Sequence, residues 1–524
     1  MYPRASRSFS VLESSFGLQM HPLVLDGAPL STNDVTHVAR AGRPVQLGGE
    51  AHLRIAAARA GVEACLNDGL AHYGINTGFG SLSRKRIPAD SLRELQVNLI
   101  RSHAAGVGTP LPDDVVRGMM LLLAASLSRG LSGARPEVVE LLLGMLNTGV
   151  TPVVPSLGSV GASGDLAPLA AIGMAMIGEG TVTITGKTIP AAEGLRSKGL
   201  TPIGLEAKEG LAIINGTHLM AARGALLAHD CDRLTDAAVA ACAMSIDAAR
   251  ASHAFLDPRV HDARRQPGQA GVARRLRDAL AGSQIVESHR ENDPRVQDPY
   301  CLRCAPQVLG ASVDLLRYVK QTIANELGAV TDNPLVFTGP KVVEIVSAGN
   351  FHGMPLAVAL DSAAIALAHV AGISERRTFW LLSAFDPESH LPAYLAKGPG
   401  LSSGLMIAQY LAAACCNEII TLATPASVSN IVTSAGIEDY NSFGPRSAAK
   451  AARSLDLAAY VVAVEIMCAA EGLEYHRPLR SGAHVERWHA AVRAVTPPLQ
   501  HDRPPGPDIE RLAAAVLAGA FSAQ

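Results

Sequence analysis

Aromatic side chains are scarce in this sequence, and so are cysteines and net charge. Phe, Trp and Tyr make up 4% of the 524 residues although 48% are hydrophobic, and alanine and leucine recur throughout. Small and aliphatic side chains favour closely packed helices over sandwiches or barrels. The composition therefore predicts an all-α protein. The length predicts more than one lobe or one elongated body.

The low charge and the few cysteines exclude several classes of protein. A net charge of −2 provides no field that would gather nucleic acid or an anionic membrane. Eight irregularly spaced cysteines are unlike the dense framework of a small secreted domain, so we expect reduced thiols in the cytoplasm. A small-molecule partner fits this composition best.

Long apolar runs are also missing. Arg223, Asp361 and Glu465 interrupt the most apolar stretches, so none reaches the ~18 residues of a membrane span. The first twenty residues contain two arginines but neither a continuous apolar core nor a small-residue cleavage site, which argues against a signal peptide. We expect a soluble, cytoplasmic protein.

What the sequence has in abundance is helical periodicity. Apolar residues recur at steps of three and four, which predicts amphipathic or buried helices, over residues 119–130, 165–180, 209–230, 306–327, 354–377, 403–420 and 446–473. In TVTITGKTI (181–189) apolar residues alternate with threonines around a Thr-Gly turn, which predicts a small β-hairpin. The expected fold is an elongated bundle of long helices with a smaller N-terminal lobe that carries loops and this hairpin.

Changes in composition suggest the domain boundaries. We expect a loosely ordered leader over 1–20 and an N-terminal lobe over 21–205 that holds the motifs described next. A long-helix bundle is expected over 206–494. A proline-rich linker and a C-terminal helix are expected over 495–524.

The turn GSVGASGDLAPLA (158–170) places small residues directly before a helix. In Ala162-Ser163-Gly164 the glycine nitrogen could attack the alanine carbonyl carbon, and loss of water from serine would leave an exocyclic methylidene. Glycine offers an unhindered nitrogen and unusual backbone angles. We expect Asp165 to accept from the amides at the start of the following helix. A simple glycine-rich helix cap is the alternative.

Seven segments in order, from about residue 70 to 480, resemble the aromatic amino-acid ammonia-lyase and aminomutase family. They include HYGINTGFGSL (72–82), NLIRSHAAGVG (98–108), GSVGASGDLAPLA (158–170), EGLAIINGT (209–217), RVQDPYCLRCAPQVLG (295–310), TDNPLVF (331–337) and GNFHG (349–353). The resemblance implies a mostly helical homotetramer whose neighbouring subunits complete each active site. It also implies a methylidene-imidazolone formed from Ala162, Ser163 and Gly164, with no metal or nucleotide.

The resemblance also implies roles for individual residues. Tyr73 would be the base that removes a carbon-bound proton, which requires positive charge or hydrogen bonds to stabilise its phenolate. Arg303 would grip the substrate carboxylate, and Tyr300 and Asn215 would hydrogen-bond the ring and the amine. The remaining matched positions are His103, Gln297, Asn350, Phe351 and Glu438. Without the resemblance, ordinary loop, surface or core roles would be preferred for several of these residues.

Two rival chemistries receive little support from the sequence. Cys301 and Cys304 form a single Cys-x-x-Cys without a second pair, so a zinc site there is not expected. No phosphate-binding glycine loop of the P-loop or dinucleotide type occurs.

The pocket positions leave the substrate open. His103 and Glu438 resemble the histidine ammonia-lyases, and a carboxylate can accept from an imidazole N–H. Ile437 and Tyr440 depart from that pattern and favour a less polar ring, and PASVSN (425–430) resembles the tyrosine and phenylalanine enzymes. The best single interpretation is elimination of ammonia from L-histidine. A lyase or 2,3-aminomutase acting on tyrosine, phenylalanine or dihydroxyphenylalanine is the alternative, and an inactive helical scaffold is a remote one.

Overall fold

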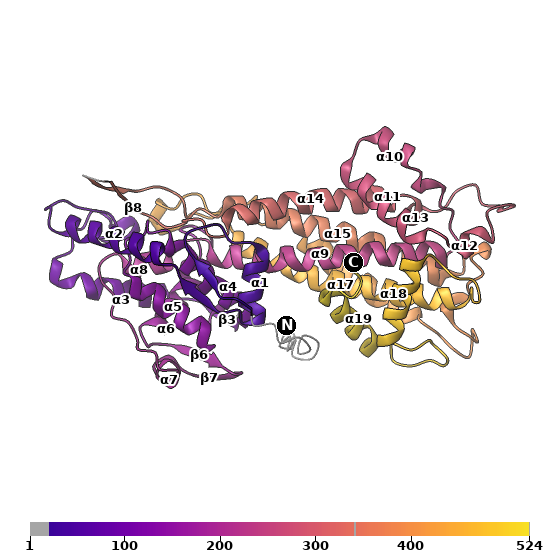
Figure 1. The fold of residues 1–524 in the computed structure, drawn as a ribbon, viewed down its shortest axis with the longest axis horizontal. Coiled ribbons are helices and arrows are strands. Elements are labelled where there is room, and N and C mark those ends of the chain that lie inside the picture. The colour runs from indigo at the N-terminus through magenta and orange to yellow at the C-terminus, as the bar shows by residue number, and fades with distance from the viewer. Residues whose placement is uncertain (1–19, 340–341, 523–524) are drawn as a thin grey trace. The chain divides into compact units, whose positions relative to one another are not determined.

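The computed structural model describes residues 20–339 and 342–522 (Figure 1). The chain divides into two compact units, which we describe separately. Unit 1 contains residues 1–226, 322–358 and 426–448, and unit 2 contains 227–321, 359–425 and 449–524. The leader expected over residues 1–20 lies outside the described residues except for Met20. The other domain boundaries expected from composition stay a prediction.

Unit 1 holds eight helices of its own and all the small sheets of the described chain. Its helices are α1 (Thr32–Ala41), α2 (Gly49–Leu66), α3 (Leu92–His103), α4 (Asp113–Ser128), α5 (Pro136–Thr148), α6 (Leu166–Met176), α7 (Ala191–Ser197) and α8 (Glu209–Ile214), with the 3-10 turns η1 (Gly80–Leu82), η2 (Ala89–Ser91) and η6 (Ser434–Gly436).

The strands of unit 1 are short. β1 (Leu23–Leu25) pairs in parallel with β2 (Val45–Leu47). Antiparallel pairs join β3 (Val107–Pro110) to β5 (Pro155–Leu157), β4 (Thr151–Pro152) to β6 (Thr181–Ile184), β6 to β7 (Lys187–Pro190), and β8 (Leu335–Thr338) to β9 (Val343–Val346). The predicted hairpin is therefore confirmed as β6–β7. Strands of two to four residues elsewhere are too short for an alternating pattern to predict.

Unit 2 is helical throughout its described regular structure. Its own helices are α10 (Pro258–Arg264), α11 (Pro267–Leu280), α12 (Gln284–Glu287), α13 (Tyr300–Arg303), α16 (Met406–Leu422), α18 (Ala483–Val495) and α19 (Gly506–Ala518), with the 3-10 turns η3 (Ala254–Leu256), η4 (Pro387–Ser389) and η5 (Ala393–Leu395). Four longer helices begin in one unit and end in the other: α9 (His218–Ala248), α14 (Ala305–Glu326), α15 (Met354–Ser383) and α17 (Gly444–Glu474).

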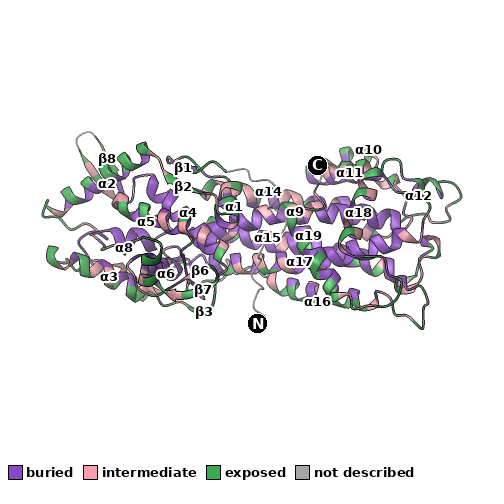
Figure 2. Cartoon of the chain, turned by 60° about the horizontal axis from the view of Figure 1, so that its bottom comes forward, coloured by how far each residue is buried: buried purple, intermediate pink, exposed green. Residues whose placement is uncertain are grey.

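Local sequence signals account for many helix ends. Ser31 and Asp34 form a capping box at α1, which ends at Gly42 in the left-handed region. Pro136 opens α5, and Gly149 closes it with φ +73°. The long helices carry buried residues along most of their length (Figure 2), as small-residue helices can when neighbours cover them on several sides. The prediction of a helix-rich fold is confirmed.

One helix that the sequence predicts as continuous is broken in the structure. The apolar pattern over 209–230 predicts a single helix, but α8 ends at Ile214 and α9 begins at His218. Asn215 is extended, and Gly216 has φ +135°. Periodicity does not detect this break because apolar residues continue on both sides of it.

The helix α15 is long and apolar enough to cross a membrane by length and composition alone. Its most apolar window has a mean hydropathy of 1.9 and is 67% buried within the protein. The core helix of a soluble protein passes the same test, so this feature is weak evidence for a membrane span. Asp361 does not shorten the apolar stretch of α15 below the length of a membrane span, as the sequence had suggested. The burial of α15 inside the protein explains why its residues are so apolar.

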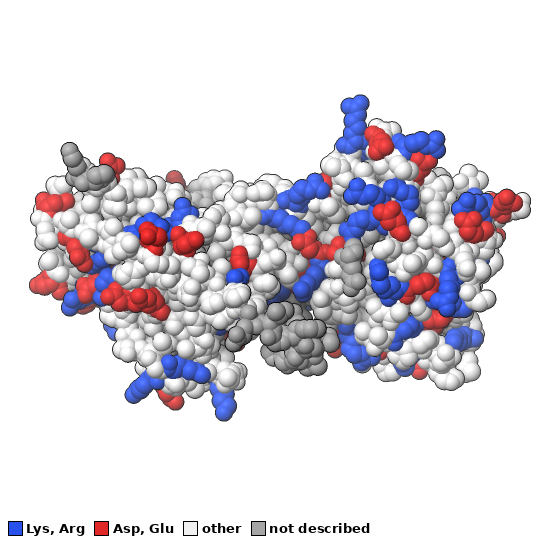
Figure 3. All heavy atoms as spheres, viewed as in Figure 1, with Lys and Arg blue, Asp and Glu red and all other residues white. Residues whose placement is uncertain are grey.

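Charges of both signs are mixed on the face shown in Figure 3. This distribution agrees with the small net charge of −2. It offers no broad basic surface on that face for a polyanion.

Candidate active site

The Ala162-Ser163-Gly164 turn lies in unit 1 between β5 and α6. Gly164 has φ +74°, and a Cβ atom at this position would overlap the carbonyl group of Gly216. The two glycines form an isolated parallel bridge. A side chain at Gly164 would therefore be excluded both by backbone conformation and by the close approach of a second chain segment.

The break between α8 and α9 supplies that second segment. The Asp165 amide donates to the Gly216 carbonyl at 2.6 Å, and the Gly216 amide faces the Ser163 carbonyl at 3.4 Å. These bonds fix the turn on both sides of Gly164. The tight turn is thus held by tertiary contacts as well as by its own residues.

Asp165 does not have the role expected of it. Its side chain makes no capping hydrogen bond to α6. Instead Oδ2 accepts from the amides of Leu219 at 2.9 Å and Met220 at 3.1 Å, at the start of α9. The expectation is wrong because the turn directs the carboxylate towards a different helix N-terminus. Burial raises the pKa of Asp165 to about 7, although these hydrogen bonds, and one with Ser159, favour the charged form.

Ser163 meets the predicted pocket residue Glu438. The Ser163 hydroxyl donates to Glu438 Oε1 at 3.4 Å, across 275 positions of sequence. Thr433 donates to Glu438 Oε2 at 2.9 Å, and the Thr433 amide donates to the Glu438 carbonyl at 3.0 Å. The carboxylate is therefore oriented by its own loop, with one oxygen towards Ser163.

Tyr73 lies on residues 72–88, which we call the Tyr73 loop. The Gly80 amide donates to the Tyr73 hydroxyl oxygen at 3.3 Å. Ile75 of this loop is fully buried in a cluster with Val62 of α2 and Val336 of β8. The turn η1 in this loop packs against η6, which precedes Glu438. The structure thus brings the Tyr73 loop next to the segment that carries Glu438.

Asn215 stands at the break between α8 and α9 and is buried. Its Nδ2 donates to the Asn333 carbonyl at 3.0 Å and to Asp332 Oδ1 at 3.4 Å, while its buried Oδ1 has no hydrogen-bond partner. Lys208, fully buried with φ +76°, donates to Asp332 Oδ2 at 2.6 Å. A buried acceptor without a partner is costly in an isolated protein and suits a site that receives a ligand.

Sequence reasoning missed Lys208 and Asp332 as supports of Asn215. Asp332 lies within the TDNPLVF motif, but nothing in the sequence indicates its role. Lys208 directly precedes EGLAIINGT and carried no signal of its own. A non-glycine residue in the left-handed region is visible only in the structure.

The remaining predicted residues of unit 1 lie on other segments of that unit. His103 ends α3, where Nδ1 contacts the Leu99 carbonyl at 2.9 Å, and β3 just beyond it pairs with β5 ahead of the turn. Asn350 is exposed and donates to the Val330 carbonyl at 3.3 Å. Phe351 is half-buried. The next residue, His352, contacts the Tyr440 carbonyl at 2.9 Å.

Gln297, Tyr300 and Arg303 belong to unit 2. Tyr300 opens α13 and is 70% exposed, and Gln297 is also exposed. The Arg303 guanidinium lies 4.5 Å from the centre of the Tyr300 ring, and its Nε donates to the Asp298 carbonyl at 2.9 Å. Within the described residues the contacts of the Arg303 guanidinium are the Tyr300 ring and the Asp298 carbonyl, so a surface ion pair does not account for it. The structure of unit 2 brings Tyr300 and Arg303 together, and Gln297 lies on the segment just before α13.

The cysteines beside Arg303 are free thiols. Burial raises the pKa of Cys301 to about 11. A protonated thiol is a weak nucleophile.

Comparisons with known proteins agree with these motifs. The family model described as aromatic amino acid lyase matches residues 30–494. A histidine ammonia-lyase from Gloeobacter violaceus is 47% identical over 490 residues, which cover 94% of this chain and 95% of the relative.

Solved structures show the same relationship. A histidine ammonia-lyase from Trypanosoma cruzi is 40% identical with a TM-score of 0.88, covering 96% of this chain and 94% of its own. The tyrosine aminomutase from Streptomyces globisporus is 33% identical with a TM-score of 0.89, covering 96% and 98%. The motifs, the helical fold and these relatives lead to one conclusion: the chain belongs to the aromatic amino acid lyase family and is a carbon–nitrogen lyase.

Proposed function

We propose that this protein eliminates ammonia from L-histidine to give the trans-arylacrylate urocanate, using a methylidene-imidazolone made from Ala162, Ser163 and Gly164. No metal or nucleotide is needed for this reaction. The observation that carries the proposal is the contact of 3.4 Å between Ser163 and Glu438. It sets a carboxylate beside the reactive turn, where an imidazole N–H of the substrate would find an acceptor.

The residues present fit such a prosthetic group. Gly164 has the left-handed backbone and the close approach to Gly216 that only glycine tolerates. Asn215 offers a buried acceptor without a partner, which could receive a donor from the substrate amine. When formed, the group would supply an electrophilic carbon that turns the substrate amine into a leaving group.

Tyr73 is our candidate for the base that removes the carbon-bound proton. The Gly80 amide donates to its oxygen at 3.3 Å and helps to orient the oxygen that would accept that proton. Ile75 and its buried cluster hold the loop against α2 and β8. His103 and Phe351 would border the substrate side chain, and Asn350 would lie near the ring.

Arg303 is our candidate for binding the substrate carboxylate through its planar guanidinium. Only its Nε donates to a backbone carbonyl within the described residues, so the terminal nitrogens remain as donors for an incoming carboxylate. Tyr300, stacked beside it, and the exposed Gln297 would complete the polar side of the pocket. Tyr300 would also hydrogen-bond the prosthetic ring or take part with Tyr73 in proton transfer.

We further propose a cytoplasmic homotetramer in which neighbouring subunits complete each active site. In unit 2, α16 exposes large apolar side chains at helical spacing: Ile407, Tyr410 and Leu411 are 54%, 58% and 38% exposed. In unit 1, Ile431, Val432, Ile437 and Tyr440 are also more than half exposed around the Glu438 loop. Apolar surfaces of this kind mark protein interfaces, and a second copy of this chain is the proposed occupant.

A tyrosine- or phenylalanine-type lyase or 2,3-aminomutase is the second candidate. Ile437 and Tyr440 flank Glu438 and are each 65% exposed, so in an assembly they would add apolar surface near the substrate ring. Such surface favours a less polar ring over imidazole. Lyase and aminomutase differ in whether ammonia adds back to the arylacrylate.

A substrate panel tests the proposal. The purified protein, without added cofactor, is incubated separately with L-histidine, L-tyrosine, L-phenylalanine and L-dihydroxyphenylalanine, and arylacrylate absorbance is followed while β-amino acids are sought by chromatography. We expect the highest kcat/KM for histidine. Higher turnover of tyrosine or phenylalanine would favour the second candidate, and turnover of none would support an inactive scaffold.

Intact mass supplies an independent test of the prosthetic group. Formation of the ring removes two waters from the chain, and borohydride, which quenches an electrophilic carbon, should abolish activity. A full translated mass in an active preparation would overturn the ring while leaving the lyase reaction in place.

A further inference from the structure

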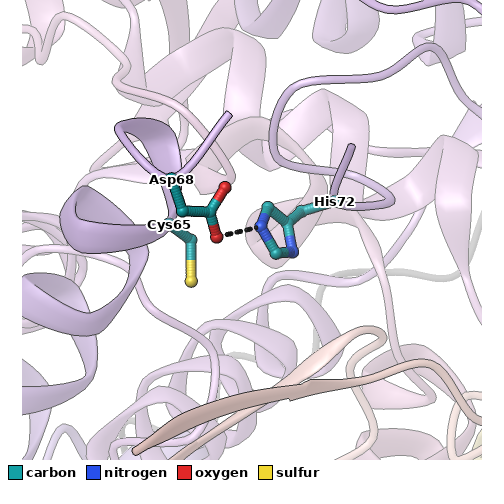
Figure 4. A group of neighbouring side chains, drawn as sticks. All are labelled: Cys65, Asp68 and His72. Carbon is teal, nitrogen blue, oxygen red and sulfur yellow. Dashed lines mark hydrogen bonds and ion pairs between the residues drawn. The ribbon is translucent and has the colours of Figure 1, made fainter. Parts of the chain in front are cut away.

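Outside the turn and its pocket, one group of metal-ligating side chains stands out in the described chain. Cys65 lies in the last turn of α2, Asp68 follows the helix, and His72 begins the Tyr73 loop. The Cys65 thiol, an Asp68 carboxylate oxygen and a His72 ring nitrogen all lie within 4.8 Å of one another. Figure 4 shows the His72 ring facing the Asp68 carboxylate and the Cys65 sulfur lying next to that carboxylate.

We propose that Cys65, Asp68 and His72 bind one divalent transition-metal ion of the zinc type, and that the bound ion fastens the start of the Tyr73 loop to the end of α2. Cysteine sulfur, imidazole nitrogen and carboxylate oxygen form a mixed donor set that suits Zn²⁺ and not the all-oxygen preference of Mg²⁺ or Ca²⁺. Three protein ligands leave a fourth position for water.

The distances require only a small adjustment. Zinc bonds of about 2.0–2.3 Å in a tetrahedral arrangement imply ligand separations of roughly 3.3–3.7 Å. His72 Nε2 and Asp68 Oδ2 are 2.8 Å apart, so they would open by somewhat less than an ångström, and the thiol would move closer. Rotation of the Cys65 and His72 side chains could supply both movements.

The backbone around the group is already held in place. Asp68 Oδ1 accepts from the Leu70 amide at 2.7 Å, which leaves Oδ2 directed towards His72. The His72 amide donates to Asn76 Oδ1 at 2.7 Å, and Asn76 Nδ2 donates to the Leu70 carbonyl at 2.8 Å. Ligand positions that are fixed before binding lower the entropic cost of capturing an ion.

Charge also favours a cation at this place. The Cys65 thiolate and the Asp68 carboxylate would together neutralise a divalent ion. Binding of the ion would displace the proton of the Cys65 thiol. Arg86 is the nearby opposing charge, and its guanidinium donates to the Gly69 carbonyl at 2.8 Å.

The position of the group explains why it would affect the loop. His72 directly precedes Tyr73, whereas Cys65 belongs to α2, whose Val62 packs against the loop residue Ile75. The apolar contact of Val62 with Ile75 is one link between α2 and the loop. A metal bound by Cys65, Asp68 and His72 would add a second. The loop backbone would then be less free to open.

Metal binding is measured directly on the full-length protein. Zn²⁺ is titrated in competition with a chromophoric chelator, and Co²⁺ is added separately to look for the thiolate-to-cobalt absorption band. We expect one ion per chain and a cobalt–thiolate band. Cys65→Ser and His72→Gln should each weaken binding by about 10- to 100-fold or more, and Cys65→Ser should abolish the band.

Two matched variants serve as controls. His52→Gln alters an exposed histidine of the same helix, and Cys416→Ser alters a partly exposed cysteine of α16; both should bind as the unaltered protein does. Equal Zn²⁺ affinity in the unaltered protein, Cys65→Ser and His72→Gln would overturn the proposal. His72→Gln keeps the buried thiol, so it remains informative if Cys65→Ser folds poorly.

Limited proteolysis tests the link to the loop. Arg84, Lys85 and Arg86 are exposed trypsin sites in the Tyr73 loop. Zn²⁺ should slow cleavage there several-fold in the unaltered protein and in both controls, but not in His72→Gln. Binding without protection would contradict the tether. Neither readout needs turnover, so failure here is distinguishable from failure of the proposed lyase reaction.

Discussion

Each unit of the protein buries an ion pair, but the two pairs have different surroundings. In unit 2, Arg377 donates to both oxygens of Glu465, at 2.5 and 2.8 Å, and both side chains are fully buried. Ser245 also donates to Glu465 at 2.8 Å. In unit 1, Lys208 and Asp332 are paired at 2.6 Å, next to Asn215, whose buried oxygen has no partner.

The difference distinguishes a pair that packs helices from a pair that supports a site. Arg377 lies on α15 and Glu465 on α17, and their fork-to-fork contact satisfies both oxygens of the carboxylate. Lys208 has a strained backbone with φ +76°, and Asp332 shares its oxygens between Lys208 and Asn215. Strain and unmet hydrogen bonds are found where a protein prepares to bind something.

The largest effect is expected at the reactive turn of unit 1. Ser163→Ala removes the hydroxyl that must leave, so activity should fall by at least about 10³-fold while the circular dichroism spectrum stays helical. Intact mass should show the full translated value in this variant. Ser156→Ala, in the neighbouring strand β5, is the control and should retain activity. Unchanged turnover in Ser163→Ala would contradict the proposed role of Ser163 in forming the prosthetic ring.

The two ion pairs can be compared directly by substitution. Arg377→Met should lower the free energy of unfolding by about 3–5 kcal/mol because Glu465 is left buried and unpaired. Adding Glu465→Leu should recover most of that loss with little change in kcat. Denaturant midpoints and kcat are the measurements.

The equivalent double variant in unit 1, Lys208→Met with Asp332→Leu, should behave differently. Stability should again recover relative to Lys208→Met alone, but kcat should remain about 10- to 100-fold low because Asn215 loses a positioning contact. Equal kcat in the two double variants would show that the pairs do not differ in function.

Substitution of Glu438 in unit 1 tests which substrate ring the site recognises. Glu438→Gln keeps the shape but removes the charge, so kcat/KM for histidine should fall by about 10- to 100-fold relative to tyrosine. Asp439→Asn changes the adjacent exposed carboxylate and should leave the ratio unaltered. If Glu438→Gln also leaves the ratio of kcat/KM for histidine and tyrosine unaltered, the Glu438 carboxylate does not contribute to recognition of the substrate ring.

The smallest expected effect concerns the pH dependence of stability. Burial raises the pKa of Asp165 from 3.8 to about 7, so between these values the folded protein holds a proton that the unfolded chain has released. This group therefore makes the free energy of unfolding fall as pH rises through that window. His218, whose pKa burial lowers to about 4, acts in the opposite direction.

Asp165→Asn isolates the first contribution. The amide oxygen can still accept from Leu219 and Met220, and the amide nitrogen can donate to Ser159. Between about pH 5 and about pH 8 the unaltered protein should lose stability relative to this variant by about 2–3 kcal/mol. Parallel stability profiles, from urea midpoints at each pH, would contradict the raised pKa.

Local sequence patterns predicted a large part of this protein. Apolar periodicity predicted most of the long helices, and alternation with a Thr-Gly turn predicted β6–β7, because these signals depend on neighbours only a few residues apart. The order of the motifs identified the family, and Ala162-Ser163-Gly164 is a chemical unit within three consecutive residues. No partner from elsewhere in the chain is needed to recognise any of these features.

Tertiary structure alone decided which distant groups meet. Glu438 reaches Ser163 across 275 positions, Asp165 binds the start of α9 and not its own helix, and Lys208 and Asp332 support Asn215 at an unpredicted helix break. Burial sets the proton affinity of Asp165 and the cost of the unpartnered Asn215 oxygen. Burial is a property of the packed chain, because the cost of removing a polar group from water depends on every neighbour that replaces the water.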